Sequence, residues 1–367
     1  MNGDERMRDR GDDYLWDRSG AIDPEVARLE RLLGAYAHAD LPRRRLRTAS
    51  TQAQARPRRR WRIAFAAAAV LVLCAIGMRA WYQQRLQWDA GRPWQLVAQH
   101  GDVRIDGRRT DARAALATDG LLVTGADAIA RLRAAGIGEI AIGQDSRLRL
   151  VETRTGRHRL QLQQGSLWAR VWAPPGQLGV GVPGAEVLDL GCEFLLQVDA
   201  DGNGSLAVRS GWVQVDNRRR DVLVPQGARV RLRADGDVGT PYDTGASASF
   251  VAALAAIDAR DGDVDARGGE VRRLVAASRP QDAISLLSLL QAYPLLADGP
   301  LFGRMAQLLP QVPASRAAWN ADRDAQLDAW RHALPYPRIK RWWTQWPDAL
   351  PARNDKLEAW LRTSGSG

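Results

Sequence analysis

The sequence has few of the residues that build disulfide frameworks, metal centres and nucleophilic active sites. It contains 2 cysteines and 4 histidines among 367 residues. Cys74 lies inside an apolar run and Cys192 far beyond it, so no disulfide is expected to join them within one chain. The histidines, at positions 38, 100, 158 and 332, are too scattered for a metal site. There is no G-x-S-x-G motif, and carboxylate pairs occur only in loops such as 258–265. We expect no metal, no cofactor and no enzymatic activity.

Two short stretches match the letters of ligand-binding motifs but lack their structural context. Gly179–Gly184 spells a dinucleotide fingerprint, yet Pro183 and a following strand stand where a helix N-terminus has to hold the pyrophosphate. Asp199–Gly204 opens like a calcium loop, yet its twelfth position is Ser210 instead of glutamate. We interpret the first stretch as a strand and the second as a hairpin tip.

Acidic residues are absent from one strongly basic stretch. The net charge of +10 is carried almost wholly by arginine, and nine arginines but no acid lie between Arg43 and Arg62. Directly after them, residues 63–78 hold no charged or strongly polar side chain. Such a run rises about 24 Å as a helix, which is short of a hydrocarbon core of about 30 Å. Arg62 and Arg79 can extend it by snorkelling, and the flanking aromatic residues suit membrane interfaces.

The pattern therefore predicts a transmembrane helix over residues 63–81. A buried core helix is the alternative for an apolar run of this length. A cleaved signal peptide does not fit, because its charged leader is a few residues long and the leader here has about sixty. Since nine arginines precede the run and only Arg79, Arg85 and Arg92 follow it closely, the positive-inside rule places residues 1–62 in the cytoplasm and the rest across the membrane.

One amphipathic helix is predicted in the cytoplasmic part, at about residues 24–38. Asp23 suits the N-cap, Pro24 the first helical position and Glu25 the first turn. Its apolar residues recur at helical spacing on one face: Val26, Leu29, Leu32, Leu33 and Tyr36. A single helix cannot bury this face by itself. The apolar face has to pack on Tyr14, Leu15 and Trp16 in a small hairpin, pair with another chain, or bind a partner. The hairpin and the binding of a partner can coexist.

This segment resembles the short cytoplasmic arm of zinc-free anti-sigma factors, whose helices clasp an extracytoplasmic-function sigma factor. His38 is its only histidine and it has no cysteine, which excludes the zinc-binding type of arm. The resemblance implies that a sigma factor binds the following residues: Tyr14, Leu15, Trp16, Val26, Leu29, Leu32, Leu33 and Tyr36.

From Trp94 to about Leu232 the sequence consists of short alternating runs separated by glycine-rich turns. In residues 158–172, Leu160 and Leu162 alternate, Gly165 is expected to turn, and the next apolar residues share a face opposite Trp168. No helices of 10 to 15 residues lie between these runs, which argues against a parallel α/β fold. We predict an all-β domain, either a sandwich of short strands or a solenoid-like roll.

The joint spacing of these runs resembles the FecR family. The residues that carry the resemblance are Leu162, Gly165, Leu167, Ala169, Val171, Val182, Pro183, Gly184, Leu190, Gly191, Cys192, Phe194, Val198, Val208, Gly211, Val213, Val215, Val224, Pro225 and Gly227. Cys192 departs from the family, which usually has threonine there, but cysteine is a small core hydrophobe. FecR proteins are bacterial inner-membrane sensors that regulate sigma factors. The resemblance implies a periplasmic β domain that contacts a protein, periplasmic or in the outer membrane, instead of a small molecule.

After Gly245 the hydrophobic period becomes helical, so residues 246–367 are expected to form an α-helical domain. Its fifth predicted helix, over 315–334, places Trp319, Leu327, Trp330 and Leu334 on one face. We expect this cluster to pack a helical core. The alternative is that the tryptophans stack on sugars or peptidoglycan.

The sequence thus divides into five parts: a cytoplasmic arm (1–62), a transmembrane helix (63–81), a linker (82–94), a FecR-like β domain (95–245) and a helical domain (246–367). This organisation predicts a single-pass signal transducer that controls a sigma factor in the cytoplasm and binds no nucleic acid itself. The alternative is an envelope-anchored structural protein that binds peptidoglycan or another protein without sigma control.

Overall fold

The structure is a computed structural model that describes residues 24–33, 58–111, 114–217, 220–259 and 264–336. It divides into two compact units, Met1–Ala69 and Val70–Gly367. In the first unit, helix α2 spans Pro24–Leu33, with Glu25 in its first turn. It begins at the proline predicted for the first helical position. The remainder of the predicted 24–38 helix lies outside the described residues.

Helix α3 (Arg58–Leu86) contains the apolar run and continues beyond it. The side chains described within the run are exposed, with Leu71 and Leu73 at 70% and 67%. The helix ends at Leu86, which is buried in the core of the β domain. Judged over the described residues, no helix combines the length and the apolarity needed to cross a membrane. The predicted transmembrane helix over 63–81 is therefore not supported by the structure.

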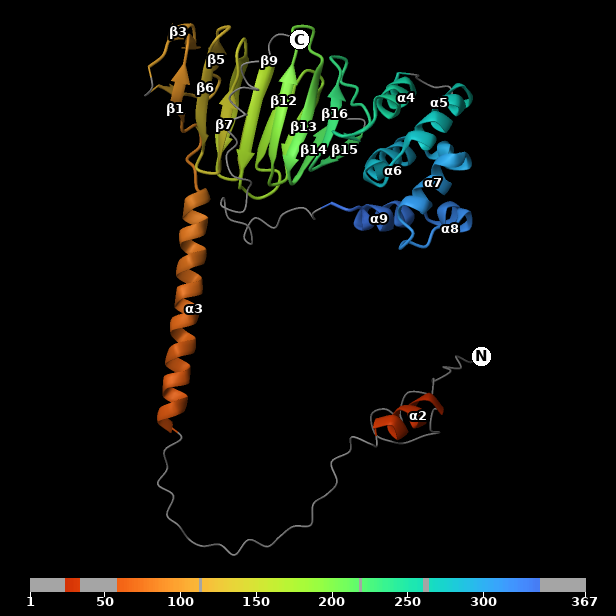
Figure 1. Cartoon of the computed structure of the whole chain (residues 1–367). Coiled ribbons are helices and arrows are strands. Elements are labelled where there is room, and N and C mark those ends of the chain that lie inside the picture. Colours follow the sequence, from red (N-terminus) through yellow and green to blue (C-terminus); the bar gives the residue numbers. More distant parts are fainter. Residues whose placement is uncertain (1–23, 34–57, 112–113, 218–219, 260–263, 337–367) are drawn as a thin grey trace, which may run out of the picture. The chain divides into compact units, whose positions relative to one another are not determined.

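In the described residues that follow, seventeen strands form two mainly antiparallel sheets that share the long strand β9. The strands are β1 (Trp94–His100), β2 (Val103–Ile105), β3 (Arg108–Arg109), β4 (Ala115–Leu116), β5 (Leu121–Thr124), β6 (Ile129–Ala134), β7 (Gly138–Ile142), β8 (Arg147–Arg154), β9 (Arg157–Val171), β10 (Leu178–Val182), β11 (Ala185–Asp189), β12 (Glu193–Val198), β13 (Gly204–Ser210), β14 (Trp212–Asp216), β15 (Asp221–Pro225), β16 (Ala228–Leu232) and β17 (Tyr242–Asp243). Figure 1 shows them side by side, from β1 at one end to β15 and β16 at the other.

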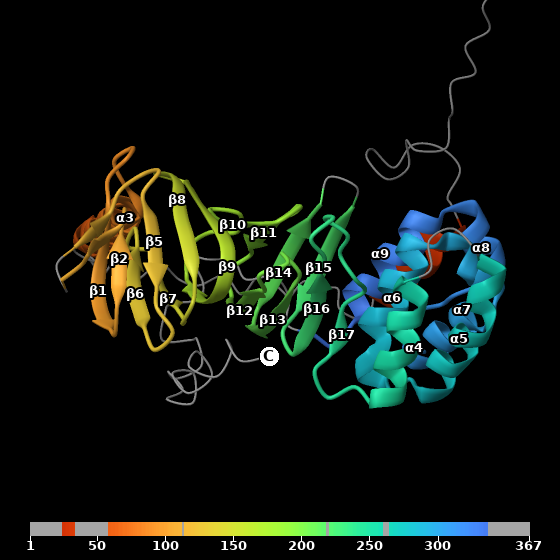
Figure 2. The ribbon, with the colours of Figure 1, turned by 90° about the horizontal axis from the view of Figure 1, so that it is seen from above.

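The first sheet has the strand order β4-β1-β6-β7-β9-β12-β13-β16-β17. The second has the order β3-β2-β5-β8-β9-β10-β11-β14-β15. From β10 onward, successive hairpins alternate between the two sheets. Strand β9 pairs with β10 in parallel, while the other pairs are antiparallel. Figure 2 shows the sheets as layers. The all-β prediction is confirmed, in a form that combines sandwich layers with a roll of hairpins.

Strand β9 crosses from one sheet to the other at Gly165. Its first half pairs with β8 and β10 and its second half with β7 and β12. The sequence predicted a turn at Gly165, and this is wrong. The residue has a φ of +100°, and a Cβ there would lie 2.4 Å from the Cα of Ser146. Glycine lets the strand bend against its neighbour without ending.

The interior lies between the two sheets and is filled by the alternating apolar residues. Leu160 and Leu162 face it from the first half of β9, and Leu167 and Ala169 from the second half. Cys192 is fully buried there, as predicted. The Asp199–Gly204 segment is the β12–β13 hairpin tip, where the Asn203 N–H donates to Asp199 Oδ1 at 2.8 Å. Both the core and the turn therefore agree with the interpretation of the sequence.

The helical domain contains α4 (Ala248–Asp258), α5 (Val264–Ala277), η2 (Pro280–Asp282), α6 (Ala283–Ala292), η3 (Pro294–Asp298), α7 (Pro300–Leu308), α8 (Arg316–Ala321) and α9 (Arg323–Ala333). The single helix predicted over 315–334 is wrong, because two helices meet at Asp322. This residue leaves the helical conformation (φ −150°) and caps α9 by accepting a hydrogen bond from the Ala325 N–H. Trp319 and Trp330 pack in the helical core at 7% and 0% exposed, as expected.

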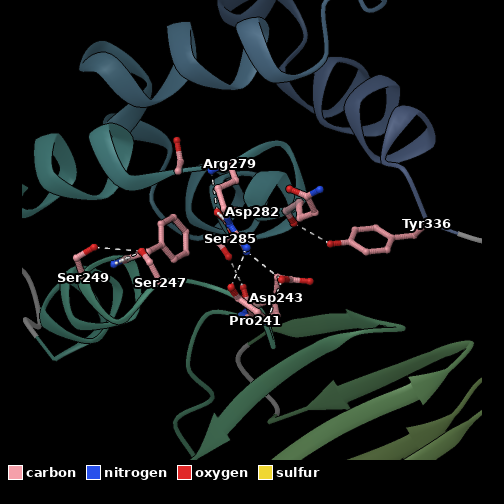
Figure 3. A network of polar contacts seen from close by, with 12 residues as sticks. Pro241, Asp243, Ser247, Ser249, Arg279, Asp282, Ser285 and Tyr336 are labelled. Carbon is pink, nitrogen blue, oxygen red and sulfur yellow. Dashed lines mark hydrogen bonds and ion pairs between the residues drawn. The ribbon is translucent and has the colours of Figure 1, made fainter.

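Arg279 fastens the helical domain to the β domain (Figure 3). Its guanidinium donates to Asp243 of β17 at 2.9 Å and to both oxygens of Asp282 at 2.9 and 3.0 Å. These hydrogen bonds to Asp282 and Asp243 raise the pKa of Arg279 above its ordinary value. Beside it, the Ser285 hydroxyl donates to the Pro241 carbonyl at 2.7 Å. The fully buried Asp282 carboxylate is thereby paired, which makes its burial tolerable.

We predict that Gly165→Ala destabilises the protein more than a glycine substitution at an open turn. The new Cβ would collide with the backbone of Ser146, and the positive φ adds strain, so the free energy of unfolding should fall by roughly 3 kcal/mol. Gly107→Ala is the matched control, because Gly107 has a φ of +78° but nothing within 4 Å. It should cost about 1 kcal/mol. Urea unfolding followed by circular dichroism measures both, and equal losses would contradict the role given to Gly165.

Candidate functional site: the helix–sheet clamp

The end of helix α3 is fixed to the β8–β9 hairpin by a set of contacts that runs from the exposed surface to the buried interior. We call this set the helix–sheet clamp. It consists of Trp88, Gly91 and Trp94 from the segment that follows α3, and Thr153, Thr155 and His158 from the hairpin. Its two sides are separated by about sixty residues of sequence, so only the fold brings them together.

The outer part of the clamp pairs Trp88 with Thr155. The Trp88 N–H donates to Thr155 Oγ1 at 2.7 Å, and this hydroxyl donates to the Trp88 carbonyl at 2.9 Å. The Thr155 N–H donates to the same carbonyl at 2.9 Å. Arg92 lies over the Trp88 ring, 4.7 Å from its centroid, and its carbonyl accepts from Trp88 Nε1. The segment is thus held by its backbone as well as by its side chains.

The inner part of the clamp is a buried chain of three side chains. Trp94 Nε1 donates to Thr153 Oγ1 at 2.8 Å, and the same hydroxyl lies 2.8 Å from His158 Nδ1. The Trp94 and His158 rings are 6.1 Å apart between centroids. The Gly91 N–H donates to the Thr153 carbonyl at 2.8 Å. Trp94 and His158 are fully buried.

The imidazole of His158 is held in its neutral form. Burial is the largest cause that lowers its pKa to about 4, the neighbouring Arg159 cation lowers it further, and Glu152 opposes the shift. Its Nε2 is buried and has no hydrogen-bond partner among the described residues. A neutral, fully enclosed histidine is therefore part of the connection between helix and sheet.

The helix–sheet clamp connects α3 closely to the β domain. Leu86 anchors the helix end in the β-domain core, and eight residues later Trp94 starts strand β1. Because the intervening segment is bonded at Trp88, Gly91 and Trp94, it leaves little slack between α3 and the domain. A displacement of the β8–β9 hairpin would be passed to the helix.

Four of the predicted partner-binding residues, Val26, Leu29, Leu32 and Leu33, belong to α2 and not to the clamp. Leu29, Leu32 and Leu33 are exposed at 56%, 64% and 62%. Val26 belongs to α2, but its side chain is outside the described residues, as are Tyr14, Leu15, Trp16 and Tyr36. That they bind a partner stays a prediction.

The clamp was not predicted from the sequence. Thr153, Thr155 and His158 looked like ordinary hairpin residues. The one available signal was the pair of tryptophans, Trp88 and Trp94, close behind an arginine-flanked apolar run. Across the described residues, no group of three or more histidine, cysteine or acidic side chains is placed to hold a metal ion.

Comparison with known proteins places the hairpin inside a family domain. The family model described as FecR protein matches residues 120–214. The chain carries a FecR domain. The match runs from β5 to β14 and includes β8 and β9, so the hairpin side of the clamp belongs to the FecR domain. The resemblance seen in the sequence is confirmed.

Two solved structures of a candidate anti-sigma factor from Parabacteroides distasonis ATCC 8503 are similar to part of the chain. The 1.65 Å structure is 14% identical with a TM-score of 0.30, covering 42% of this chain and 74% of that one. The 2.50 Å structure is 13% identical with a TM-score of 0.29, covering 42% and 73%. These scores are too low to support conclusions about this chain. No curated protein matches it significantly.

We predict that Thr155→Val loosens the clamp while the FecR domain stays folded. The valine keeps the shape but removes two hydrogen bonds, so amide exchange at Gly91 should speed up about tenfold, equivalent to roughly 1.4 kcal/mol. Thr110→Val is the control, since its hydroxyl bonds to Gln99 and Val103 and not to a residue of the clamp. It should leave Gly91 unchanged. Unaltered protection of Gly91 in Thr155→Val would rule out the outer part of the clamp.

Proposed function

We propose that the protein is a single-pass signal transducer of the bacterial inner membrane that regulates an extracytoplasmic-function sigma factor. The observation that carries the proposal is the FecR match over residues 120–214. FecR proteins are sensors that regulate sigma factors. In this proposal residues 1–62 are cytoplasmic, and the FecR and helical domains are periplasmic.

The membrane part of the proposal is supported by the distribution of arginines around the apolar run and by the exposure of its apolar side chains. Nine arginines precede the apolar run at Ile63, and three follow it closely. Exposed leucines and valines on α3, such as Leu71 and Val72, are unusual in water and ordinary in lipid. The run is short for a bilayer, and we propose that snorkelling arginines extend it.

The sensing part of the proposal requires two states of the periplasmic domains that the cytoplasmic arm can distinguish. The helix–sheet clamp supports such a link, because it joins the FecR domain to α3 without a slack linker. Binding of another envelope protein to the FecR domain would then change the position or the freedom of α3. No catalytic step is part of this proposal.

The cytoplasmic part of the proposal assigns sigma-factor binding to the apolar face of α2. Leu29, Leu32 and Leu33 are all more than half exposed, and an exposed apolar face of this kind suits a protein partner. The competing function, stacking of the tryptophan-rich domain on peptidoglycan, finds less support. Trp319 and Trp330, the two tryptophans of this domain within the described residues, are buried in the helical core.

Topology can be tested with reporter fusions. Alkaline phosphatase fused ahead of Arg43 should be inactive, and phosphatase fused after Tyr336 should be active, because the enzyme folds only outside the cytoplasm. β-Galactosidase fusions at the same positions serve as controls and should give the opposite pattern. Phosphatase activity from the fusion ahead of Arg43 would refute the proposed orientation.

The docking face can be tested by co-purification with a sigma factor encoded nearby. The double variant Leu29→Asp with Leu32→Asp should reduce recovery of the sigma factor at least tenfold, since it places two charges on the apolar face. Ala27→Asp with Arg31→Asp is the matched control, because it adds the same two aspartates to the opposite side of the helix. Equal recovery from both double variants would exclude this face.

A further inference from the structure

The helix–sheet clamp contains a histidine that has no place for a second proton. His158 is fully buried, and its Nδ1 is paired with the Thr153 hydroxyl. A neutral imidazole has one N–H and one lone pair, so either tautomer can use this single partner. An imidazolium has two N–H groups. The second would point into the interior from Nε2, where the described residues offer no acceptor.

The charged groups around His158 do not compensate for an added positive charge. They are Glu152 and Arg154 on β8, Arg157 and Arg159 on β9, Glu186 on β11, and the exposed Asp89 and Arg92 on the segment after α3. Glu152 is already engaged by Arg154 and Arg157 at 2.7 and 2.8 Å. Glu186 is engaged by Arg159 at 2.6 Å. Glu152 and Glu186 are therefore already paired with arginines, Asp89 is exposed to solvent, and the Arg159 cation repels an imidazolium.

We propose that the helix–sheet clamp is an acid-operated latch, in which protonation of His158 frees Thr153 and Trp94 and releases residues 87–94 from the β8–β9 hairpin. The release disconnects α3 from the FecR domain. Only this consequence for signalling rests on the proposed function, because the latch itself is a property of the FecR domain and the segment before it.

The direction of the pH dependence follows from the pKa of His158. Burial lowers it to about 4 in the closed clamp, whereas a solvated imidazole titrates at its ordinary value of 6.5. The clamp is at full strength above pH 6.5 and weakens as the pH falls from 6.5 towards 4. Between pH 7.5 and pH 5, the opening equilibrium constant should rise roughly 25-fold.

Hydrogen exchange on the full chain in detergent micelles tests the latch. The reporters are the Gly91 and Thr155 amides, which donate across the clamp to Thr153 and Trp88. After correction for intrinsic exchange, wild-type protection should fall roughly 25-fold between pH 7.5 and pH 5. His158→Gln keeps a neutral hydrogen-bonding side chain and should abolish this fall. His100→Gln, at an exposed histidine of β1, is the matched control and should retain it.

Two outcomes would overturn the proposal: wild-type protection that does not change with pH, or an unchanged acid response in His158→Gln. Should His158→Gln fail to fold, histidine-labelled wild-type protein provides a second measurement, since the chain has only 4 histidines. A His158 resonance that titrates near its ordinary pKa would also overturn the latch. Neither readout involves the sigma factor, so failure of the latch and failure of the proposed function are distinguishable.

Discussion

The passage of strand β9 from one sheet to the other is the constraint on which the β domain depends. Its 15 residues pair with four different strands, two in each sheet, and so make a single body of both layers. The crossing needs a residue that accepts a positive φ and close contact with the Ser146 backbone, and Gly165 provides both. Because the side chains of a strand alternate, the bend also has to bring the apolar residues of both halves to the same interior. Leu162 and Leu167 on either side of Gly165 both face the core.

The same strand places the chemistry of the helix–sheet clamp. Its first residues form one arm of the β8–β9 hairpin, so His158 and Thr153 lie where the chain enters the domain from α3. The inner part of the clamp, Trp94, Thr153 and His158, consists of buried polar contacts. Such contacts are specific when each group is satisfied and costly when one is not. The connection is therefore closed when His158 is neutral and opens more readily when His158 is protonated. A purely apolar contact would not respond to protonation.

At the other end of the β domain, the connection to the helices is also polar at its centre and apolar around it. Arg279 joins Asp243 of the last strand to the buried Asp282, while Trp212 and Tyr242 pack against the helical core. Tyr336 donates to the Gln281 carbonyl, and its ring meets Trp212 edge-on at 5.9 Å between centroids. The β domain is therefore bonded to the segment after α3 at one end and to the helical domain at the other.

The sequence alone determined the elements and their class. Alternation with a period of two, glycine-marked turns and the later helical period were sufficient to predict the β domain, the helices and the FecR resemblance, because these patterns are local. The break at Asp322 and the crossing at Gly165 were missed. At Asp322 the chain could continue one helix or cap a new one, and at Gly165 it could turn or bend. In both places the outcome depends on the residues that pack nearby, which are distant in sequence. Only the tertiary structure decided the clamp. Trp88 and Thr155 are 67 residues apart, and nothing local to either residue encodes their hydrogen bonds. The burial that neutralises His158 arises only when both sheets have closed around it.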